Sequence, residues 1–334
     1  MDAVRRIEWV LAEALADTDN PSAPRVLAAA LKHAVFPGGA RIRPRLCLAV
    51  AMACGDDCQP LSNASAAAIE LMHCASLVHD DLPCFDNADT RRGQPSVHKA
   101  FGERIAVLTG DALIVLAYQT LSAQIHHQAD RAGRLLMALS KAVGLPGGIV
   151  AGQAWESESV VDLRQYQRAK TGALFAAASA MGAASAGEDP LQWEALGNWL
   201  GEAYQVADDI RDVAADAAEL GKPVGQDLCH GRPSAVSTLG LSGAIARFEQ
   251  LMAQALTSIP DCRGAKALSA LLHAESQRLI PGHLLRSPPR DARIQAGSQH
   301  GFSATHKAHA STQQADAATD PQAISIAYES AKSA

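Results

Sequence analysis

Aromatic residues are scarce in this sequence of 334 residues, in which phenylalanine, tyrosine and tryptophan together make up 4%. The β-branched and aromatic residues that strands favour are thinly scattered, whereas alanine, the strongest helix former, occurs 67 times. There is no βαβ rhythm, no glycine-rich phosphate loop after a strand and no internal repeat of fixed period. The composition therefore predicts an all-α fold.

Long apolar runs are also missing. No uninterrupted apolar stretch approaches the roughly 18 residues of a membrane span, although 48% of the residues are hydrophobic and can bury a large core. The amino end, MDAVRRIEWVLAEALAD, mixes charged and apolar residues as an amphipathic helix does, and it lacks the apolar block of a signal peptide. We expect a soluble, cytoplasmic protein without a membrane span.

Basic residues are outnumbered, since 29 Lys and Arg stand against 35 Asp and Glu and give a net charge of −6. This balance argues against general nucleic-acid binding, which needs a basic field, and means that an anionic substrate requires locally placed cations. The 7 cysteines form no CxxC pair and no Cys/His zinc spacing. A reduced protein without structural zinc is the simplest interpretation.

Helix signals divide the chain into long segments. Apolar residues at spacings of three and four predict helices over residues 3–17, 24–34 and 65–82, and Pro83 ends the third because proline cannot donate to the helix ladder. Another helix is expected after Pro190, with a stop at Gly221.

The composition changes near residue 286. Residues 286–334 are polar, rich in Ser, Gln, His and Ala, and nearly without large apolar side chains. We therefore expect one large helical domain over residues 1–285, followed by a disordered tail over residues 286–334.

Two aspartate clusters stand near the ends of apolar helices, DDLPCFD at residues 80–86 and DDIRD at residues 208–212. In the first, the helix break at proline lets Asp86 return beside Asp80. In the second, like charges four residues apart share a helical face near the negative end of the helix dipole. A single cluster is more often a solvated helix end, but two favour Mg²⁺, which binds a few carboxylates, waters and substrate phosphate oxygens.

Cationic side chains surround the first cluster. Arg91 and Arg92 follow it, and His73 lies two helical turns before Asp80, about 10 Å away on the same side. The GGARIRP segment at residues 38–44 adds guanidinium groups, which bind phosphate as a fork. This pattern predicts one cavity for two phosphate-bearing groups, one at the metal cluster and one at a cationic patch.

Taken jointly, these motifs resemble the trans-isoprenyl diphosphate synthases (polyprenyl synthetase family), and within them the bacterial geranylgeranyl diphosphate synthases. The segments GGARIRP, ELMHCASLVHDDLPCFDNADTRRGQPSVHKAFGE, GDAL, AKTGALF and YQVADDIRDV followed by GKPVGQD occur in the family's order. The resemblance implies a single large helical bundle of the isoprenoid synthase type with a central cavity, usually a homodimer.

The resemblance also implies a role for each matching residue. Asp80 and Asp86 would ligate two Mg²⁺ ions with Asp81 in support, and Asp208 would ligate a third. The allylic diphosphate would be held by Arg91, Lys170 and Lys222.

Further positions would serve the allyl cation and the second substrate. Thr171 and Gln205 would present oxygen dipoles near the forming cation. Isopentenyl diphosphate would be held by Arg43, His73 and Arg92. The family usually has lysine where this chain has Ala40, and we expect Arg41 to compensate.

The implied reaction is the Mg²⁺-dependent head-to-tail condensation of isopentenyl diphosphate with dimethylallyl, geranyl or farnesyl diphosphate. In this family the residues five and four positions before the first aspartate form a floor that limits the growing chain. Here they are Ala75 and Ser76, neither of which is aromatic. The resemblance therefore predicts geranylgeranyl diphosphate, with twenty carbons, ahead of farnesyl diphosphate.

Three alternatives stay open: a farnesyl diphosphate synthase, a non-catalytic regulatory subunit of a prenyl synthase, and a class I terpene cyclase. The second metal motif of a cyclase mixes Asn, Ser or Thr with Glu, unlike DDIRD. Only Ala40 favours a regulatory subunit, and such subunits tend to lose their aspartates. The roles of Gln153 and Glu156 in GQAWE are also open, because they either line the cavity entrance or cap helices.

Overall fold

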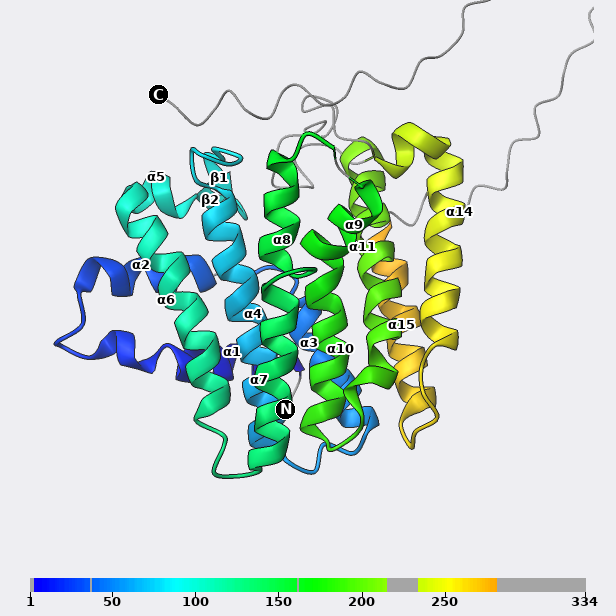
Figure 1. Cartoon of the computed structure of the whole chain (residues 1–334), viewed down its shortest axis with the longest axis horizontal. Coiled ribbons are helices and arrows are strands. Elements are labelled where there is room, and N and C mark those ends of the chain that lie inside the picture. The colour runs from blue at the N-terminus through cyan, green and yellow to red at the C-terminus, as the bar shows by residue number, and fades with distance from the viewer. Residues whose placement is uncertain (1–2, 37, 161, 215–233, 281–334) are drawn as a thin grey trace, which may run out of the picture. The chain divides into compact units, whose positions relative to one another are not determined.

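The computed structural model describes residues 3–36, 38–160, 162–214 and 234–280 (Figure 1). The predicted tail, residues 286–334, and the predicted ligand Lys222 lie outside these ranges. Within the described residues the only strands are β1 (Thr90–Arg91) and β2 (Gln94–Pro95), which form one antiparallel hairpin. All other regular structure there is helical, which confirms the expected all-α fold.

The α-helices are α1 (Ala3–Ala14), α2 (Arg25–Val35), α3 (Ile42–Ala53), α4 (Gln59–Asp80), α5 (Val97–Phe101), α6 (Glu103–Ser122), α7 (Ala129–Val143), α8 (Ile149–Ala154), α9 (Leu163–Gln167), α10 (Ala173–Ser185), α11 (Glu194–Ala214), α14 (Ala235–Thr257) and α15 (Ala265–Leu279). Short 3₁₀- or π-helical turns are η1 (Ala16–Asp19), η2 (Trp155–Ser157), η3 (Arg168–Gly172) and η4 (Pro190–Trp193).

The ends of two predicted helices show how local signals act. Helix α4 begins at Gln59, earlier than the sequence predicts, because Pro60 occupies its first turn, where a missing N–H costs no hydrogen bond. It ends at Asp80, three residues before Pro83. The segment after Asp189 begins as the 3₁₀ turn η4 and continues as α11.

Helix α10 packs against α3, α4, α7 and α11, and nearly all of its residues are buried. Small residues let its backbone approach its neighbours. A Cβ atom at Gly182 would lie 2.4 Å from the carbonyl oxygen of Cys47 on α3, and one at Gly197 on α11 would lie 2.2 Å from that of Phe175. The abundance of alanine thus corresponds to close helix packing around a few large core side chains such as Trp193.

Helix α6 is, among the described residues, the one helix long and apolar enough to cross a membrane by length and composition alone. In the structure it packs along α4 and also contacts α2, α5 and α7. Leu113, Ala117 and Leu121 are fully buried in these contacts, whereas Val107, Leu108 and Val115 are exposed. Helix α6 is therefore a helix of the bundle with one exposed apolar face.

Candidate active site

A cavity of about 510 Å³ lies between the start of α3, α4, the β1–β2 hairpin, α8, η3 and α11. Most of the residues that the sequence predicts for the site line it: Ala40, Arg41, Arg43, His73, Ser76, Asp80, Arg91, Arg92, Lys170, Thr171, Gln205 and Asp208. Ala75, Asp81 and Asp86 are not among the residues that line it. The fold thus brings both aspartate clusters and the cationic segments around one space.

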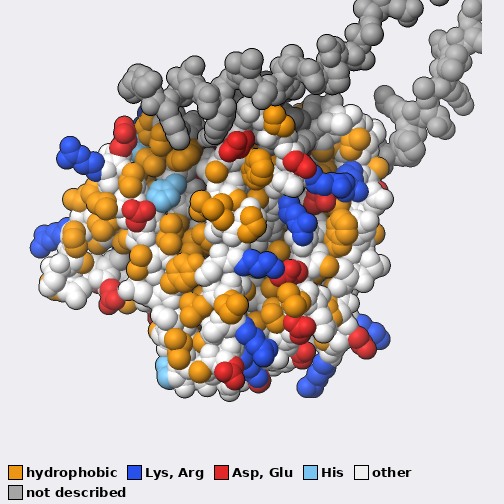
Figure 2. Space-filling model, viewed as in Figure 1, with side chains coloured by type: hydrophobic (Ala, Val, Ile, Leu, Met, Phe, Trp, Pro, Cys, Tyr) orange, Lys and Arg blue, Asp and Glu red, His pale blue; other side chains and the backbone are white. Residues whose placement is uncertain are grey.

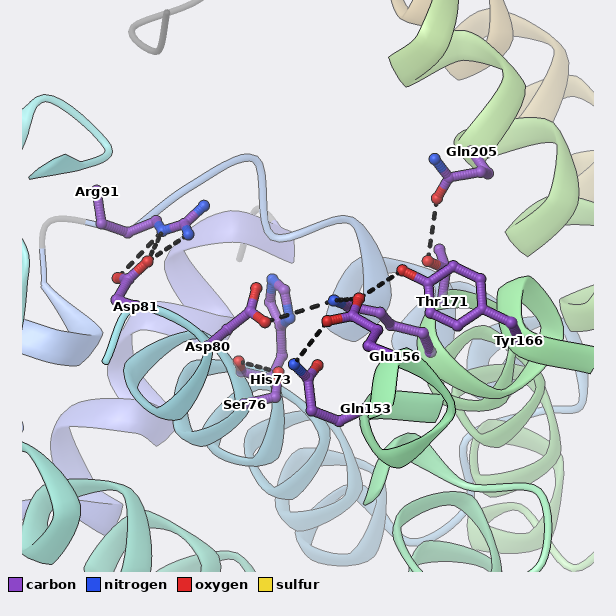
Figure 3. Close-up of polar contacts among 11 residues, drawn as sticks. His73, Ser76, Asp80, Asp81, Arg91, Gln153, Glu156, Tyr166, Thr171 and Gln205 are labelled. Carbon is purple, nitrogen blue, oxygen red and sulfur yellow. Dashed lines mark hydrogen bonds and ion pairs between the residues drawn. The ribbon is translucent and has the colours of Figure 1, made fainter. Parts of the chain in front are cut away.

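Asp80, at the end of α4, points toward a polar network on η2, α9 and η3 (Figure 3). Lys170 Nζ lies 3.4 Å from Asp80 Oδ1 and 2.5 Å from Glu156 Oε1. Glu156 also accepts hydrogen bonds from the Tyr166 hydroxyl at 2.6 Å and from Gln153 Nε2 at 3.2 Å. Lys170 is therefore held between two carboxylates at the acidic end of the cavity.

The sequence motifs do not assign Gln153, Glu156 or Tyr166 to the site. The first two lie three residues apart and so share one helical face, and this face is directed at Lys170. That spacing in GQAWE is the signal that could have identified them, whereas no local motif indicates Tyr166.

The loop after α4 brings Asp86 back to the helix end, as the helix break at Pro83 predicts. The backbone N–H of Asp86 donates to the carbonyl oxygen of Asp80 at 2.9 Å. Burial raises the pKa of Asp80, Lys170 opposes that shift, and the charge of Asp86 adds to it. Negative charge is thus concentrated at the end of α4, where a bound cation would favour the ionised carboxylates.

The three aspartates of the second cluster have separate environments. Asp208 lines the cavity and accepts a hydrogen bond from Arg211 Nη2 at 2.9 Å. Asp209 accepts from Gln205 Nε2 at 3.0 Å and from the first backbone N–H of α14 at 2.7 Å, so it joins α11 to α14. Asp212 is buried, and its Oδ1 has no hydrogen-bond partner within the described residues.

This donor set fits Mg²⁺. Asp80 from α4 and Asp208 from α11 line the same cavity, and both offer the hard oxygen ligands that Mg²⁺ prefers. In the part of the chain that the structure describes, no three His, Cys, Asp or Glu residues come together as a complete metal cage. A Mg²⁺ ion held by these carboxylates would keep waters and take further oxygens from a substrate phosphate.

The opposite end of the cavity is cationic. Arg43 Nη1 lies 3.4 Å from His73 Nε2, and the guanidinium lies 4.6 Å from the centre of the Phe175 ring and 5.9 Å from that of Tyr204. Burial lowers the pKa of His73 well below its usual value, and the charges of Arg43 and Arg92 lower it further. His73 is therefore a neutral hydrogen-bonding group near pH 7.

Arg92 reaches this end from the β1–β2 turn, where its φ is +54°. A Cβ atom at Gly39 would lie 2.9 Å from Arg92 Nε, so the second glycine of GGARIRP leaves room for the guanidinium. Arg92 Nη2 lies 3.8 Å from Glu70. The loop before α3 and the β1–β2 hairpin can therefore pack closely, because Gly39 has no side chain.

Arg41 lines the cavity, and its guanidinium is also held by groups inside the protein. Its side chain is buried and donates to Glu8 at 2.8 Å, to Glu70 at 2.6 Å and to the carbonyl oxygen of Val35 at 2.8 Å. The guanidinium therefore ties α1 and α4 to the end of α2. These contacts occupy most of the guanidinium donors, and the compensation of Arg41 for Ala40 in substrate binding stays a prediction.

Asp81 also differs from its neighbour Asp80. Its carboxylate is 2% exposed and binds the guanidinium of Arg91 through Nε, at 3.0 and 3.2 Å, and through Nη2 (Figure 3). Burial raises the pKa of Asp81, and Arg91 opposes the shift. Asp81 therefore acts on the cavity through Arg91.

The two predicted floor residues do not lie alike. Ser76 lines the cavity one turn below Asp80, and its hydroxyl donates to the carbonyl oxygen of His73 at 2.8 Å. Ala75 is 1% exposed, packs in the core and is not among the lining residues, and the role of both residues as a floor stays a prediction. Adjacent residues of a helix point about 100° apart, which explains the difference.

Thr171 on η3 and Gln205 on α11 both line the cavity and lie side by side (Figure 3). The Thr171 hydroxyl donates to Gln205 Oε1 at 3.1 Å, and Gln205 Nε2 donates to Asp209. The amide orientation of Gln205 is fixed at both ends. The lone pairs of the Thr171 oxygen remain for the cavity, which it lines.

An all-α cavity lined by aspartates of two clusters and by several arginines suits the class of enzyme that handles diphosphate substrates with Mg²⁺. Comparison with known proteins agrees. The family model described as polyprenyl synthetase matches residues 24–269. The chain therefore belongs to the polyprenyl synthetase family, whose members are prenyltransferases that join isopentenyl diphosphate to allylic diphosphates.

Individual relatives agree with this assignment. The chain is 52% identical over 280 residues to a geranylgeranyl diphosphate synthase of Cereibacter sphaeroides, covering 84% of this chain and 97% of the relative. A geranyltransferase structure from Legionella pneumophila is 30% identical with a TM-score of 0.70, covering 83% of this chain and 94% of that one. A Helicobacter pylori geranyltransferase complexed with magnesium and isoprenyl diphosphate is 29% identical with a TM-score of 0.68, covering 82% and 98%.

Proposed function

We propose that this protein is a Mg²⁺-dependent geranylgeranyl diphosphate synthase. The observation that carries the proposal is that Asp80 and Asp208, from helices far apart in the sequence, line one cavity whose other end holds Arg43, His73 and Arg92. This arrangement suits two diphosphates side by side, one at the carboxylates and one at the cations. The name of the relative from Cereibacter sphaeroides supports the same product.

Asp80, Asp86 and Asp208 would hold about three Mg²⁺ ions with the allylic diphosphate. When bound, the ions neutralise the departing pyrophosphate. Lys170 is already fixed beside Asp80 by Glu156, so its ammonium is positioned to bind the same diphosphate. Charge stabilisation by fixed groups needs no reorganisation during the reaction.

Arg91 would complete the allylic site from the hairpin. Asp81 holds its guanidinium through the Nε and Nη2 atoms, which leaves the remaining N–H donors for phosphate oxygens. Lys222 would add a further cation, as the family resemblance implies; it lies outside the described residues.

Isopentenyl diphosphate would bind at Arg43, His73 and Arg92. A neutral His73 donates one ring N–H without adding charge beside Arg43, which is the state its lowered pKa favours. The double bond of this substrate then attacks the allyl cation formed at the carboxylate end. Thr171 is placed to stabilise that cation with its oxygen, and the released pyrophosphate is the proton acceptor that we propose.

Ser76 supports a product longer than fifteen carbons. It is the residue that lines the cavity one turn below Asp80, and a serine leaves space there that a phenylalanine or tyrosine ring would fill. A prenyl chain anchored at Asp80 can therefore pass that level. A fifteen-carbon product remains the alternative to be distinguished.

The test is to incubate the purified protein with Mg²⁺, labelled isopentenyl diphosphate and each allylic diphosphate in turn, and to analyse the dephosphorylated products. We expect geranylgeraniol from all three primers. Farnesol as the main product would contradict the product assignment. No condensation at all would favour a regulatory subunit, and cyclic hydrocarbons would favour a terpene cyclase.

Substitutions test the metal site in the same assay. Asp80→Ala and Asp208→Ala should each lower kcat by several orders of magnitude, because each removes a ligand for charge that develops in the transition state. Asp261→Ala, at an exposed loop position, is the matched control and should keep full activity. Full activity of either site variant with unchanged circular dichroism would contradict the site.

We also propose that the protein is a homodimer joined through the exposed face of α6. Val107, Leu108 and Val115 are 42%, 50% and 55% exposed, and hydrophobic side chains gather on the face that α6 and α8 present in Figure 2. Large exposed apolar patches commonly mark protein interfaces. Light scattering after gel filtration should give the mass of two chains, and Val115→Glu should give that of one.

A further inference from the structure

Tyr166 belongs to the polar network at the acidic end of the cavity, although no step of the reaction proposed above uses it (Figure 3). It lies on α9, whereas Glu156 lies on η2 and Lys170 on η3. Its hydroxyl donates to Glu156 Oε1 at 2.6 Å, the oxygen that also accepts from Lys170 Nζ at 2.5 Å. Tyr166 and Lys170 therefore share one carboxylate oxygen.

The backbone around Lys170 is closely packed. A Cβ atom at Gly152 on α8 would lie 2.4 Å from the backbone nitrogen of Lys170, so α8 and η3 are in direct backbone contact. Residues Arg168–Gly172 of η3 form a π-helix, an irregularity that often occurs at functional sites. Because this backbone has little room to shift, we expect substrate binding to move the side chain of Lys170 rather than its backbone.

Two carboxylates compete for the ammonium of Lys170. Its Nζ lies 2.5 Å from Glu156 and 3.4 Å from Asp80. The three side chains are each only 17–23% exposed, so water replaces these contacts incompletely. An allylic diphosphate bound with Mg²⁺ at Asp80 would draw the ammonium away from Glu156. That transfer costs free energy, because it takes a hydrogen-bond donor from a partly buried carboxylate.

The hydroxyl of Tyr166 lowers this cost. It is neutral and can remain on Glu156 when the ammonium leaves, as can Gln153 Nε2, which lies 3.2 Å from the other carboxylate oxygen. An ionised carboxylate has enough lone pairs to accept from all three donors at once. The ring of Tyr166 also attracts the ammonium, since Lys170 Nζ lies 5.9 Å from the ring centre, within the range of a cation–π interaction.

We propose that Tyr166 is a positioning residue that allows Lys170 to transfer from Glu156 to the allylic diphosphate. Its hydroxyl keeps Glu156 hydrogen-bonded during the transfer. The identity of the ligand rests on the proposed function, which places the allylic diphosphate at Asp80. Tyr166 thus affects the affinity for the allylic substrate and leaves that for isopentenyl diphosphate, at the other end of the cavity, unchanged.

Steady-state condensation assays of Tyr166→Phe test this role. Loss of the hydroxyl should raise the KM for farnesyl diphosphate about tenfold, the size expected for one hydrogen bond to a charged group. The value of kcat and the KM for isopentenyl diphosphate should stay as in the wild type. Tyr118→Phe is the matched control, because the Tyr118 hydroxyl donates to Ser140 at 3.2 Å and neither residue lines the cavity. An equal rise in both KM values, or no rise in either, would overturn the proposal.

A double-mutant cycle separates an action through Glu156 from a merely structural role. In Glu156→Gln the side chain is neutral and has no charge with which to retain the ammonium. Adding Tyr166→Phe to that variant should therefore leave the KM for farnesyl diphosphate unchanged. The same rise with Glu156 and with Gln at this position would overturn the action through Glu156. Circular dichroism of each variant checks that it is folded.

Binding of inorganic pyrophosphate with Mg²⁺, measured by calorimetry, separates this proposal from the proposed function, because it requires no condensation. Binding about tenfold weaker in Tyr166→Phe, in a protein that forms no prenyl product, would keep the role of Tyr166 and remove the proposed function. Condensation activity together with equal pyrophosphate affinity in Tyr166→Phe and the wild type would keep the synthase and remove the role of Tyr166.

Discussion

Replacing Asp81 by Asn tests whether this residue acts through Arg91. The substitution keeps the shape of the side chain and removes the charge that holds the guanidinium in the hairpin. Hydrogen bonds to charged groups contribute about 1.5–3 kcal/mol each, and the Arg91 side chain is 34% exposed. Because water screens part of the lost interaction, we expect the free energy of unfolding to fall by about 1.5–2 kcal/mol.

The same change should alter substrate binding more than chemistry. With its anchor weakened, Arg91 is no longer held at the allylic diphosphate, so the KM for farnesyl diphosphate should rise about tenfold, equivalent to about 1.4 kcal/mol. The value of kcat and the Mg²⁺ concentration for half-maximal activity should change little, because Asp81 does not line the cavity.

Steady-state kinetics at several Mg²⁺ concentrations and thermal unfolding provide the measurements. Asp89→Asn is the matched control in the same loop, since Asp89 is exposed and pairs with Lys99 at the surface. It should leave KM and Tm unchanged. If Asp81→Asn instead lowered kcat by orders of magnitude and raised the Mg²⁺ requirement at an unchanged KM, Asp81 would be a metal ligand. That result would refute its assignment as the residue that holds Arg91.

Three other substitutions test single features of the cavity. In the folded protein the pKa of His73 is lowered, so the unfolded chain takes up a proton there first as pH falls. The free energy of unfolding therefore falls below a pH of about 6.5. In urea unfolding, His73→Gln should reduce the decrease in this free energy between pH 8 and 5.5 by up to about 1.4 kcal/mol. Ser76→Phe should shorten the main product from twenty to fifteen carbons. Ala75→Phe should chiefly lower the free energy of unfolding, by about 1–3 kcal/mol. A shorter product from Ala75→Phe but not from Ser76→Phe would contradict the assignment of Ser76 to the cavity lining. Ala40→Lys should lower the KM for isopentenyl diphosphate and leave the allylic KM unchanged, because most donors of Arg41 are used inside the protein. No change in either KM would show that other cations already provide the charge needed to bind isopentenyl diphosphate.

The sequence alone determined the features that depend on short spacing. The abundance of alanine and the apolar periodicity predicted an all-α fold. Pro83 predicted that the helix before it would stop and that Asp86 would return to Asp80, where the structure has a backbone hydrogen bond. The order of the motifs predicted the family that the comparison then showed. Each of these follows from interactions within a few residues or from the motifs themselves.

Only the tertiary structure decided which of two neighbouring residues serves the cavity. Asp80 lines it while Asp81 binds Arg91, and Ser76 lines it while Ala75 is buried in the core. Adjacent side chains on a helix or turn diverge, so the one that faces the cavity depends on packing against elements far away in the chain. The contacts of Lys170 with Glu156 and with Asp80 likewise arise only when separate helices meet, which no local pattern of residues specifies.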